Sequence, residues 1–217
     1  MKANELAFFG KIAAGVTHEL KNVLAVINET NGLTADLLAM LEEAPFPHRE
    51  KLQRSAKRIE EQVRRGVEII SRFNRFAHSI DYPLADVDLN SIVTQTVSLS
   101  HRFAALLNVE LQGAVCDLPI MLFTSEFRVQ MALTKAIEAF IKCMGGAGSI
   151  LIKVQNDLGA PGLDFYFGGE CCEKVAKGAV EEFSEWGEFE ELAAILDISH
   201  GWRTSDGGFA LFFHKRA

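Results

Sequence analysis

The sequence predicts a two-part fold: a long α-helical hairpin that pairs with a second copy as a dimeric four-helix bundle, followed by an α+β sandwich domain. Three observations predict it. Apolar residues repeat every seven positions through about the first 80 residues, two prolines interrupt that repeat once, and strand-like segments between turn residues appear only afterwards. The composition suits a soluble fold, because 48% of the 217 residues are hydrophobic and 24% are charged.

The first helix is predicted from Glu5 to about Leu41. Two rows of residues seven apart define its apolar seam: Phe9, Val16, Val23, Thr30 and Leu37 in one, and Ala13, Leu20, Ile27, Thr34 and Leu41 in the other. The two prolines of residues 42–47 end this helix, because a proline disfavours helical geometry in the residue before it.

A second helix is predicted from His48 to about Ile80. Its rows are Leu52, Ile59, Gly66, Phe73 and Ile80, and Ala56, Val63, Ile70 and Ala77. A short turn makes the two helices an antiparallel hairpin, which we assign to residues 1–82. Further apolar residues widen the stripe, namely Ile12, Leu24, Leu38, Ile69 and Phe76. A lone hairpin cannot cover so wide a stripe, so we expect a homodimer.

A linker over residues 81–86 leads to a second domain, residues 87–217. Helices are predicted over 91–107, 127–144, 173–183 and 188–198, and strands over 109–111, 150–154, 163–167 and 208–214, with turn residues over 156–162. This order predicts one helical layer on one sheet.

Charge and composition exclude several kinds of partner. The net charge of −7 and pI near 5.4 argue against nucleic acid, which requires an excess of Lys and Arg. No apolar run reaches membrane-spanning length, and no signal peptide is visible. The four cysteines lack metal or redox spacing, so we expect no metal and a reduced, cytoplasmic protein. Because the helical pattern starts near residue 5, we expect no sensor domain ahead of it.

His18 is the candidate chemical residue. In the heptad register it points away from the seam, and three of its six neighbours three, four and seven positions away are Ala or Gly: Lys11, Ala14, Gly15, Lys21, Asn22 and Ala25. A helix face meant only for solvent would carry long charged side chains there. Bare surroundings let another protein approach the imidazole, although a plain surface histidine would have the same spacing.

The segment from Phe9 to Ile27 resembles the H-box of the dimerisation and histidine-phosphotransfer domain of sensor histidine kinases. The pattern is a His followed by an acidic residue, Leu or Ile, a basic residue and Asn, here residues 18–22; the family often continues with Pro, where this chain has Val23. The resemblance implies that His18 accepts phosphate, Glu19 orients the ring and takes its other proton, and Asn22 positions water for dephosphorylating a bound receiver domain. The alternative from the residues alone is that Glu19 is a solvated charge and Asn22 a surface polar residue.

The second domain resembles the ATP-binding domain of the same kinases in element order, and only weakly in motifs. On the helix over 128–144, Ala139 stands where the family has its Mg-binding Asn, and Lys135 where it has an earlier Asn. The adenine-binding Asp is missing from residues 168–172, and the glycine-rich lid is missing too. Because Mg-ATP needs a metal ligand and phosphate-binding groups, we predict weak ATP binding or none, hence no cofactor of the chain's own.

An intact H-box beside an eroded nucleotide site predicts a dimeric histidine phosphotransfer protein of a two-component phosphorelay, exchanging phosphate with response-regulator receiver domains. The receiver would supply Asp and Mg²⁺, and docking is expected on the face around His18 and on residues 73–78 of the second helix. A sensor histidine kinase is a possible further partner. Two alternatives stay open: a catalytically silent kinase-like regulator, and a divergent histidine kinase or receiver phosphatase.

Two charged stretches and the remaining histidines receive no catalytic role. Residues 49–65 hold seven basic and three acidic side chains, which favours a solvated bundle face over a nucleic-acid site. Residues 170–191 hold eight Glu and two Lys, which favours a solvated acidic surface over a partner contact. His48, His78, His101, His200 and His214 show no metal-ligand spacing.

Overall fold

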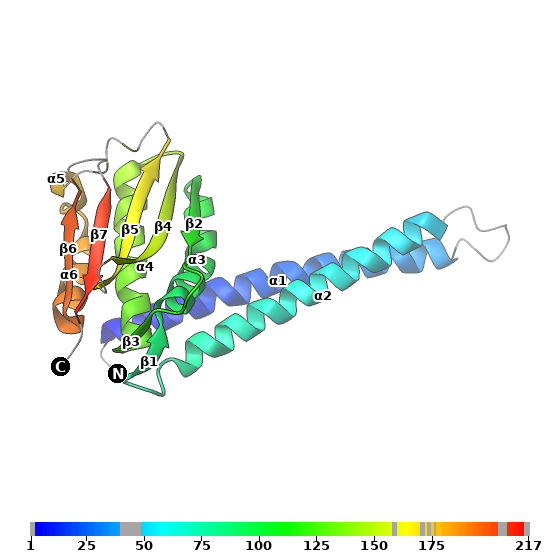
Figure 1. Ribbon diagram of the computed structural model, residues 1–217. Coiled ribbons are helices and arrows are strands. Elements are labelled where there is room, and N and C mark those ends of the chain that lie inside the picture. The colour runs from blue at the N-terminus through cyan, green and yellow to red at the C-terminus, as the bar shows by residue number, and fades with distance from the viewer. Residues whose placement is uncertain are drawn as a thin grey trace. The chain divides into compact units, whose positions relative to one another are not determined.

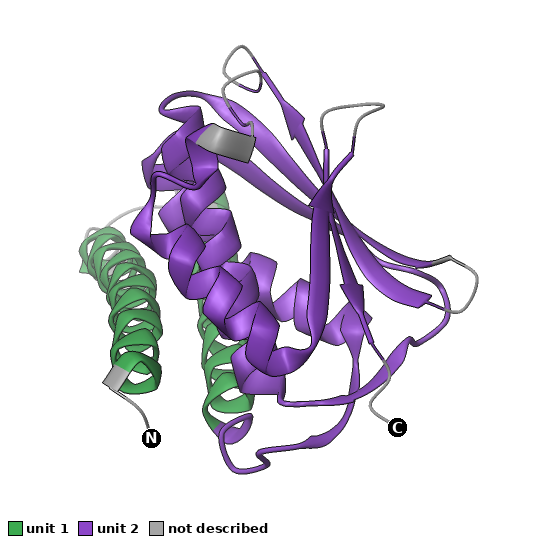
Figure 2. Cartoon of the chain, turned by 90° about the vertical axis from the view of Figure 1, so that its left-hand side faces the viewer, with its two compact units in different colours: residues 1–77 green, residues 78–217 purple. Residues whose placement is uncertain are grey.

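The computed structural model describes residues 3–39, 49–157, 160–169, 172, 175, 177–203 and 208–214. The chain forms two compact units, residues 1–77 and residues 78–217 (Figure 2). The first is a helical hairpin and the second is an α+β domain, so both predicted parts of the fold are confirmed. The dimeric four-helix bundle stays a prediction.

The hairpin consists of α1 (Ala3–Ala39) and α2 (Arg49–His78) (Figure 1). The expected helix ends at Leu41 and His48 lie outside the described residues. The expectation that α2 reaches Ile80 is wrong. Asp81 turns the chain back instead, because its N–H donates to the His78 carbonyl at 3.1 Å and its carboxylate lies 2.8 Å from His78 Nδ1.

The seam between α1 and α2 changes in character along its length. At the open end of the hairpin, Phe76 is fully buried, and its ring centroid lies 5.7 Å from that of Phe8 and 5.8 Å from that of Phe9. Near the middle, a Cβ placed on Gly66 would stand 3.3 Å from Val23 Cγ1. Aromatic packing therefore closes one end, and a glycine allows close approach in the middle.

Only part of the predicted apolar pattern is buried within one hairpin. Of the first row of α1, Val16, Val23, Thr30 and Leu37 are buried. In the second row of α2, two apolar residues remain exposed to solvent, Val63 at 50% and Ile70 at 47%. Further exposed apolar residues on the hairpin are Leu6, Leu24, Leu33 and Val67.

The second unit builds one helical layer on one sheet (Figure 1). Its sheet has the order β2-β4-β5-β7-β6, in which β2 and β4 are parallel and the other neighbours are antiparallel. The strands are β2 (Val109–Ala114), β4 (Gly148–Asp157), β5 (Ala160–Gly168), β6 (Ile198–Trp202) and β7 (Phe209–Phe213). The helices are α3 (Leu89–Leu106), α4 (Glu126–Met144), α5 (Lys177–Val180) and α6 (Ser184–Leu196).

Several sequence-predicted boundaries in this unit are wrong. The turn expected over 156–162 is mostly strand, because β4 and β5 pair as far as Asp157 and Ala160. Phe183 is the N-cap of α6 and not the end of a helix, and Ile198 belongs to β6, since the left-handed residue Asp197 ends α6. The expected start of the helix over 173–183 falls on residues outside the described ranges, and α5 begins at Lys177.

A short two-stranded sheet was not predicted. It pairs β1 (Ala85–Asp88) with β3 (Met121–Thr124), so part of the expected linker is strand. Asp88 then caps α3, its carboxylate accepting from the N–H of Asn90 at 3.2 Å and of Ile120 at 2.9 Å. This carboxylate joins the start of the domain to its third strand.

Candidate functional site

His18 is an exposed side chain in the first half of α1. Its Nδ1 lies 3.3 Å from Nδ2 of Asn22, one helical turn further on. Either the Asn22 amide donates to Nδ1, or the amide is turned over and its oxygen accepts from Nδ1–H. In the second arrangement the neutral ring carries its proton on Nδ1, which leaves Nε2 as an unprotonated nucleophile.

Glu19 is half-buried and lies on a different side of the helix from His18, because adjacent helical residues are about 100° apart. The contact at His18 Nδ1 is made by Asn22. The structure thus brings His18 and Asn22 together, while the part expected of Glu19 stays a prediction.

The surface around His18 is open. A Cβ built on Gly15, three residues before His18, would meet no atom within 4 Å, and the neighbouring Ala14 and Ala25 are exposed. The small residues predicted to surround the imidazole therefore leave it accessible on this face of α1.

The expected place of residues 73–78 beside His18 is wrong. Phe73 and Phe76 pack against Phe9, about two and a half turns before His18 along α1. Val23, which approaches Gly66, lies after His18 along α1. The part of α2 opposite His18 therefore falls between Gly66 and Phe73. Heptad spacing within each helix does not reveal which residues of the two helices face each other.

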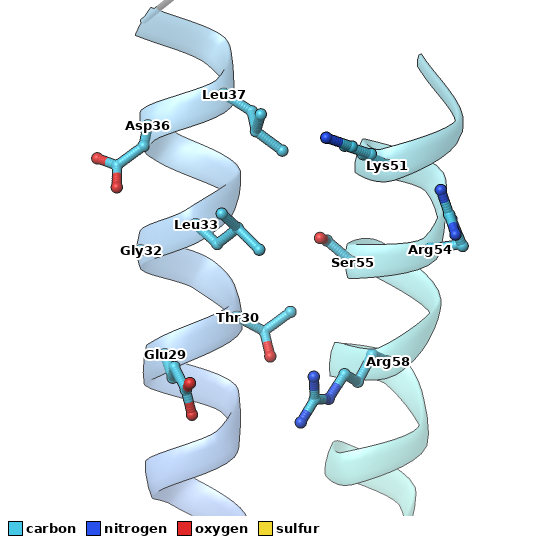
Figure 3. A pocket seen from close by; sticks show the side chains of 10 residues that line it. All are labelled: Glu29, Thr30, Gly32, Leu33, Asp36, Leu37, Lys51, Arg54, Ser55 and Arg58. Atoms are coloured by element: carbon cyan, nitrogen blue, oxygen red, sulfur yellow. The ribbon is translucent and has the colours of Figure 1, made fainter. Parts of the chain in front are cut away.

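Further along the same hairpin, a groove of about 750 Å³ opens between α1 and α2. It is lined by Glu29, Thr30, Gly32, Leu33, Asp36, Leu37, Lys51, Arg54, Ser55 and Arg58. Figure 3 shows Leu33 and Leu37 directed toward α2, and Lys51 and Arg58 directed toward α1. Sequence analysis missed this groove because it depends on how the two helices pair.

In the second unit, the residue aligned with the family's metal-binding Asn is buried and cannot bind a metal. Ala139 is fully buried in the hydrophobic core, and a methyl group cannot bind a metal. Lys135, one turn earlier, is engaged by α6, since its Nζ lies 3.0 Å from Glu188 Oε2. Within the described ranges, no group of three or more His, Cys, Asp or Glu side chains could hold a metal ion.

The acidic stretch around α6 is more than a solvated surface. Besides Glu188, the Glu185 carboxylate binds Lys142 of α4. Burial raises the pKa of Glu185, but the hydrogen bond and charge of Lys142 outweigh it, so this pKa is lowered overall. These two ion pairs hold α6 against α4.

Comparison with known proteins gives structural likeness only. No protein-family model and no curated protein matches the chain, and none of its described helices is long and apolar enough to cross a membrane. Similar solved structures include the Acinetobacter baumannii histidine kinase AdeS, at 11% identity and a TM-score of 0.49, covering 92% of this chain and 98% of that one. The catalytic domain of histidine kinase ThkA aligns at 13% identity and a TM-score of 0.47, covering 62% and 98%.

A bacterial phosphotransferase aligns at 12% identity and a TM-score of 0.43, covering 99% of this chain and 98% of that one. These three similar structures are two histidine kinases and a phosphotransferase.

Proposed function

We propose that the chain is a histidine phosphotransfer protein of a two-component phosphorelay, which accepts and donates a phosphoryl group at His18. The observation that carries the proposal is the pairing of an exposed His18 with Asn22, inside an H-box-like motif, on a bare helix face. A receiver domain docks on this face. Such a relay works in the cytoplasm, where the chain's cysteines remain reduced.

The main contribution of this chain to the reaction is to position the His18 imidazole. Nε2 of His18 attacks the phosphorus of the receiver's aspartyl phosphate, the P–N bond forms, the P–O bond to aspartate breaks, and the carboxylate leaves. The ring then carries a proton on Nδ1, which Asn22 stabilises through its amide oxygen or Glu19 accepts. The return transfer reverses each step. Asn22 also positions water if the bound receiver is dephosphorylated.

The metal belongs to the partner. The receiver supplies the Mg²⁺ that neutralises the transferring phosphoryl oxygens, and this chain brings no cofactor of its own. Buried Ala139 and ion-paired Lys135 support this assignment, because neither offers an oxygen to a metal. We therefore place phosphate entry at a receiver and not at ATP.

We propose further that two copies form a four-helix bundle through the open row of α2 and the matching apolar residues of α1. Val63 and Ile70 lie seven residues apart and are about half exposed, which is unfavourable for a bare helix surface. The double substitution Val63→Glu with Ile70→Glu is expected to give monomers in sedimentation equilibrium. The matched pair Gln53→Glu with Ser71→Glu, on exposed polar positions of α2, should leave the dimer intact.

Phosphotransfer from radiolabelled receiver domains tests the function. Acid-labile label should reach the wild type and the His78→Ala control, whose histidine is exposed on α2, but not His18→Ala. If receivers bind without labelling the chain or losing phosphate, the relay is refuted and the silent regulator takes its place. Saturable Mg-ATP binding would instead support the divergent kinase.

A further inference from the structure

The cations near His18 determine how a phosphoryl group on that side chain would be held. The six neighbours of His18 on its helix face include two lysines, Lys11 and Lys21, and no carboxylate. The part of α2 opposite His18 carries one cation, Arg72, which is already paired, since its Nη2 lies 3.6 Å from Glu68 Oε2. The two lysines of α1 are therefore the candidates for holding an anion at this site.

Of these two lysines, Lys21 leans toward His18 and Lys11 leans away from it. Each Cα–Cβ bond of an α-helix is tilted toward the N-terminus, so a long side chain covers the turn that precedes it. Lys21 follows His18 by three residues, about 4.5 Å along the helix axis, whereas Lys11 precedes it by seven residues, about 10.5 Å. Asn22 shows the same direction, because its Nδ2 lies 3.3 Å from His18 Nδ1, one turn earlier.

Lys21 has no counter-charge of its own. The residues three and four positions away from it on α1 are all uncharged or titrate only as histidine: Thr17, His18, Leu24 and Ala25. Lys21 is exposed, and within the described part of the chain it forms no ion pair and no hydrogen bond. In the second unit, by contrast, Lys135 is bound by Glu188. The ammonium group of Lys21 is thus free to bind an anion that arrives at His18.

Building on the proposed function, we infer that Lys21 binds the phosphoryl group carried by His18. Its ammonium group contacts the phosphoryl oxygens while Asn22 contacts the ring at Nδ1. A Cβ at Gly15 would meet no atom within 4 Å, so the face has room for a phosphoryl group. Lys21 keeps its proton and forms no covalent bond. It stabilises the phosphorylated form because a cation lies beside an anion.

Phosphoramidate, a small phosphodonor, tests Lys21 without a receiver. Nε2 of His18 attacks the phosphorus, the bond from phosphorus to the donor nitrogen breaks, and that protonated nitrogen leaves as ammonia. Phosphorus NMR of the intact protein then follows the ionisation of the phosphoryl group with pH. The variants are Lys21→Gln, Lys21→Arg and the control Lys11→Gln, which removes the same charge from the same helix face. Far-UV circular dichroism checks that the helices are retained.

The cation should favour the fully ionised phosphoryl group. We therefore expect the pH midpoint of its last ionisation to rise by about 0.5–1 unit in Lys21→Gln, a three- to tenfold change in proton affinity. The midpoint should stay near wild type in Lys11→Gln and return toward it in Lys21→Arg. In 1 M KCl the difference should shrink, because salt screens exposed charges. An unchanged midpoint in Lys21→Gln, or an equal rise in Lys11→Gln, would overturn the inference.

The failure of this inference is distinguishable from the failure of the proposed function. If receivers label wild type but Lys21→Gln leaves the midpoint unchanged, the relay stands and the role of Lys21 is refuted. If no receiver labels wild type while the phosphoramidate-labelled protein shows the expected shift, the relay is refuted and the role of Lys21 stands. If neither donor labels His18, both are refuted.

Discussion

Replacing Gly15 by glutamine should raise the stability of α1 and at the same time obstruct access to His18, so that the two effects can be measured separately. Nothing lies within 4 Å of a Cβ at this position, so the new side chain meets no clash within the chain. Glycine in a helix interior is about 1 kcal/mol less favourable than alanine, and glutamine is close to alanine. Gly15→Gln should therefore raise the free energy of unfolding of the hairpin by about 0.5–1 kcal/mol.

The same side chain covers the approach to His18, because residues three apart are neighbours on a helix. We expect kcat/KM for transfer from a phosphorylated receiver to fall at least about tenfold, although the protein is more stable. Urea unfolding followed by circular dichroism, at fixed protein concentration, gives the first quantity, and radiolabel transfer gives the second.

Gly10→Gln is the matched control. Gly10 has equally open space but lies eight residues, or about 12 Å, before His18. It should gain similar stability and keep its transfer rate. Unchanged transfer in Gly15→Gln would refute the idea that the bare face is the docking surface.

Three further outcomes follow from the packing and the titrating groups. Phe76→Ala should cost about 3–5 kcal/mol of hairpin stability in urea unfolding, because it empties the fully buried aromatic end of the seam; a loss below 1 kcal/mol would contradict that packing. Burial lowers the pKa of His200, and the charge of Glu190 opposes this shift without cancelling it. The second unit should therefore be most stable above about pH 6.5, near the ordinary pKa of histidine, and its free energy of unfolding should decrease as the pH falls below that value. His200→Gln should flatten that dependence between pH 7.5 and 5.5, and an unchanged slope would assign it to other groups. Isothermal titration with Mg-ATP should show no saturable binding at micromolar concentration, given Ala139 and Lys135.

The sequence predicted the elements better than their pairing. Heptad rows located both long helices, because helical periodicity is a local property of the chain. The spacing of His18 and Asn22 likewise predicts a contact, since residues four apart meet on a helix face.

Features that depend on distant segments were missed. The β1–β3 pair joins strands of four residues, too short for a periodic signal, and Asp88 links them through a hydrogen bond to Ile120. The groove and the true level of His18 on α2 depend on how two helices pair across a turn, and no local pattern encodes that register.

Gly66 carries no chemistry, yet the geometry of the site depends on it. The distance from His18 to the groove charges on α2 is set by the register of the two helices, and the register is held in the middle by Val23 against the bare backbone of Gly66. A Cβ there would stand 3.3 Å from Val23 Cγ1, and the valine is stiff about χ1, so a larger side chain must separate or slide the helices. Lys51 and Arg58 would then move relative to His18 although neither was altered. Under the proposed function, a receiver that docks on α1 and α2 together would sense this shift, whereas a small phosphodonor that contacts only His18 would not.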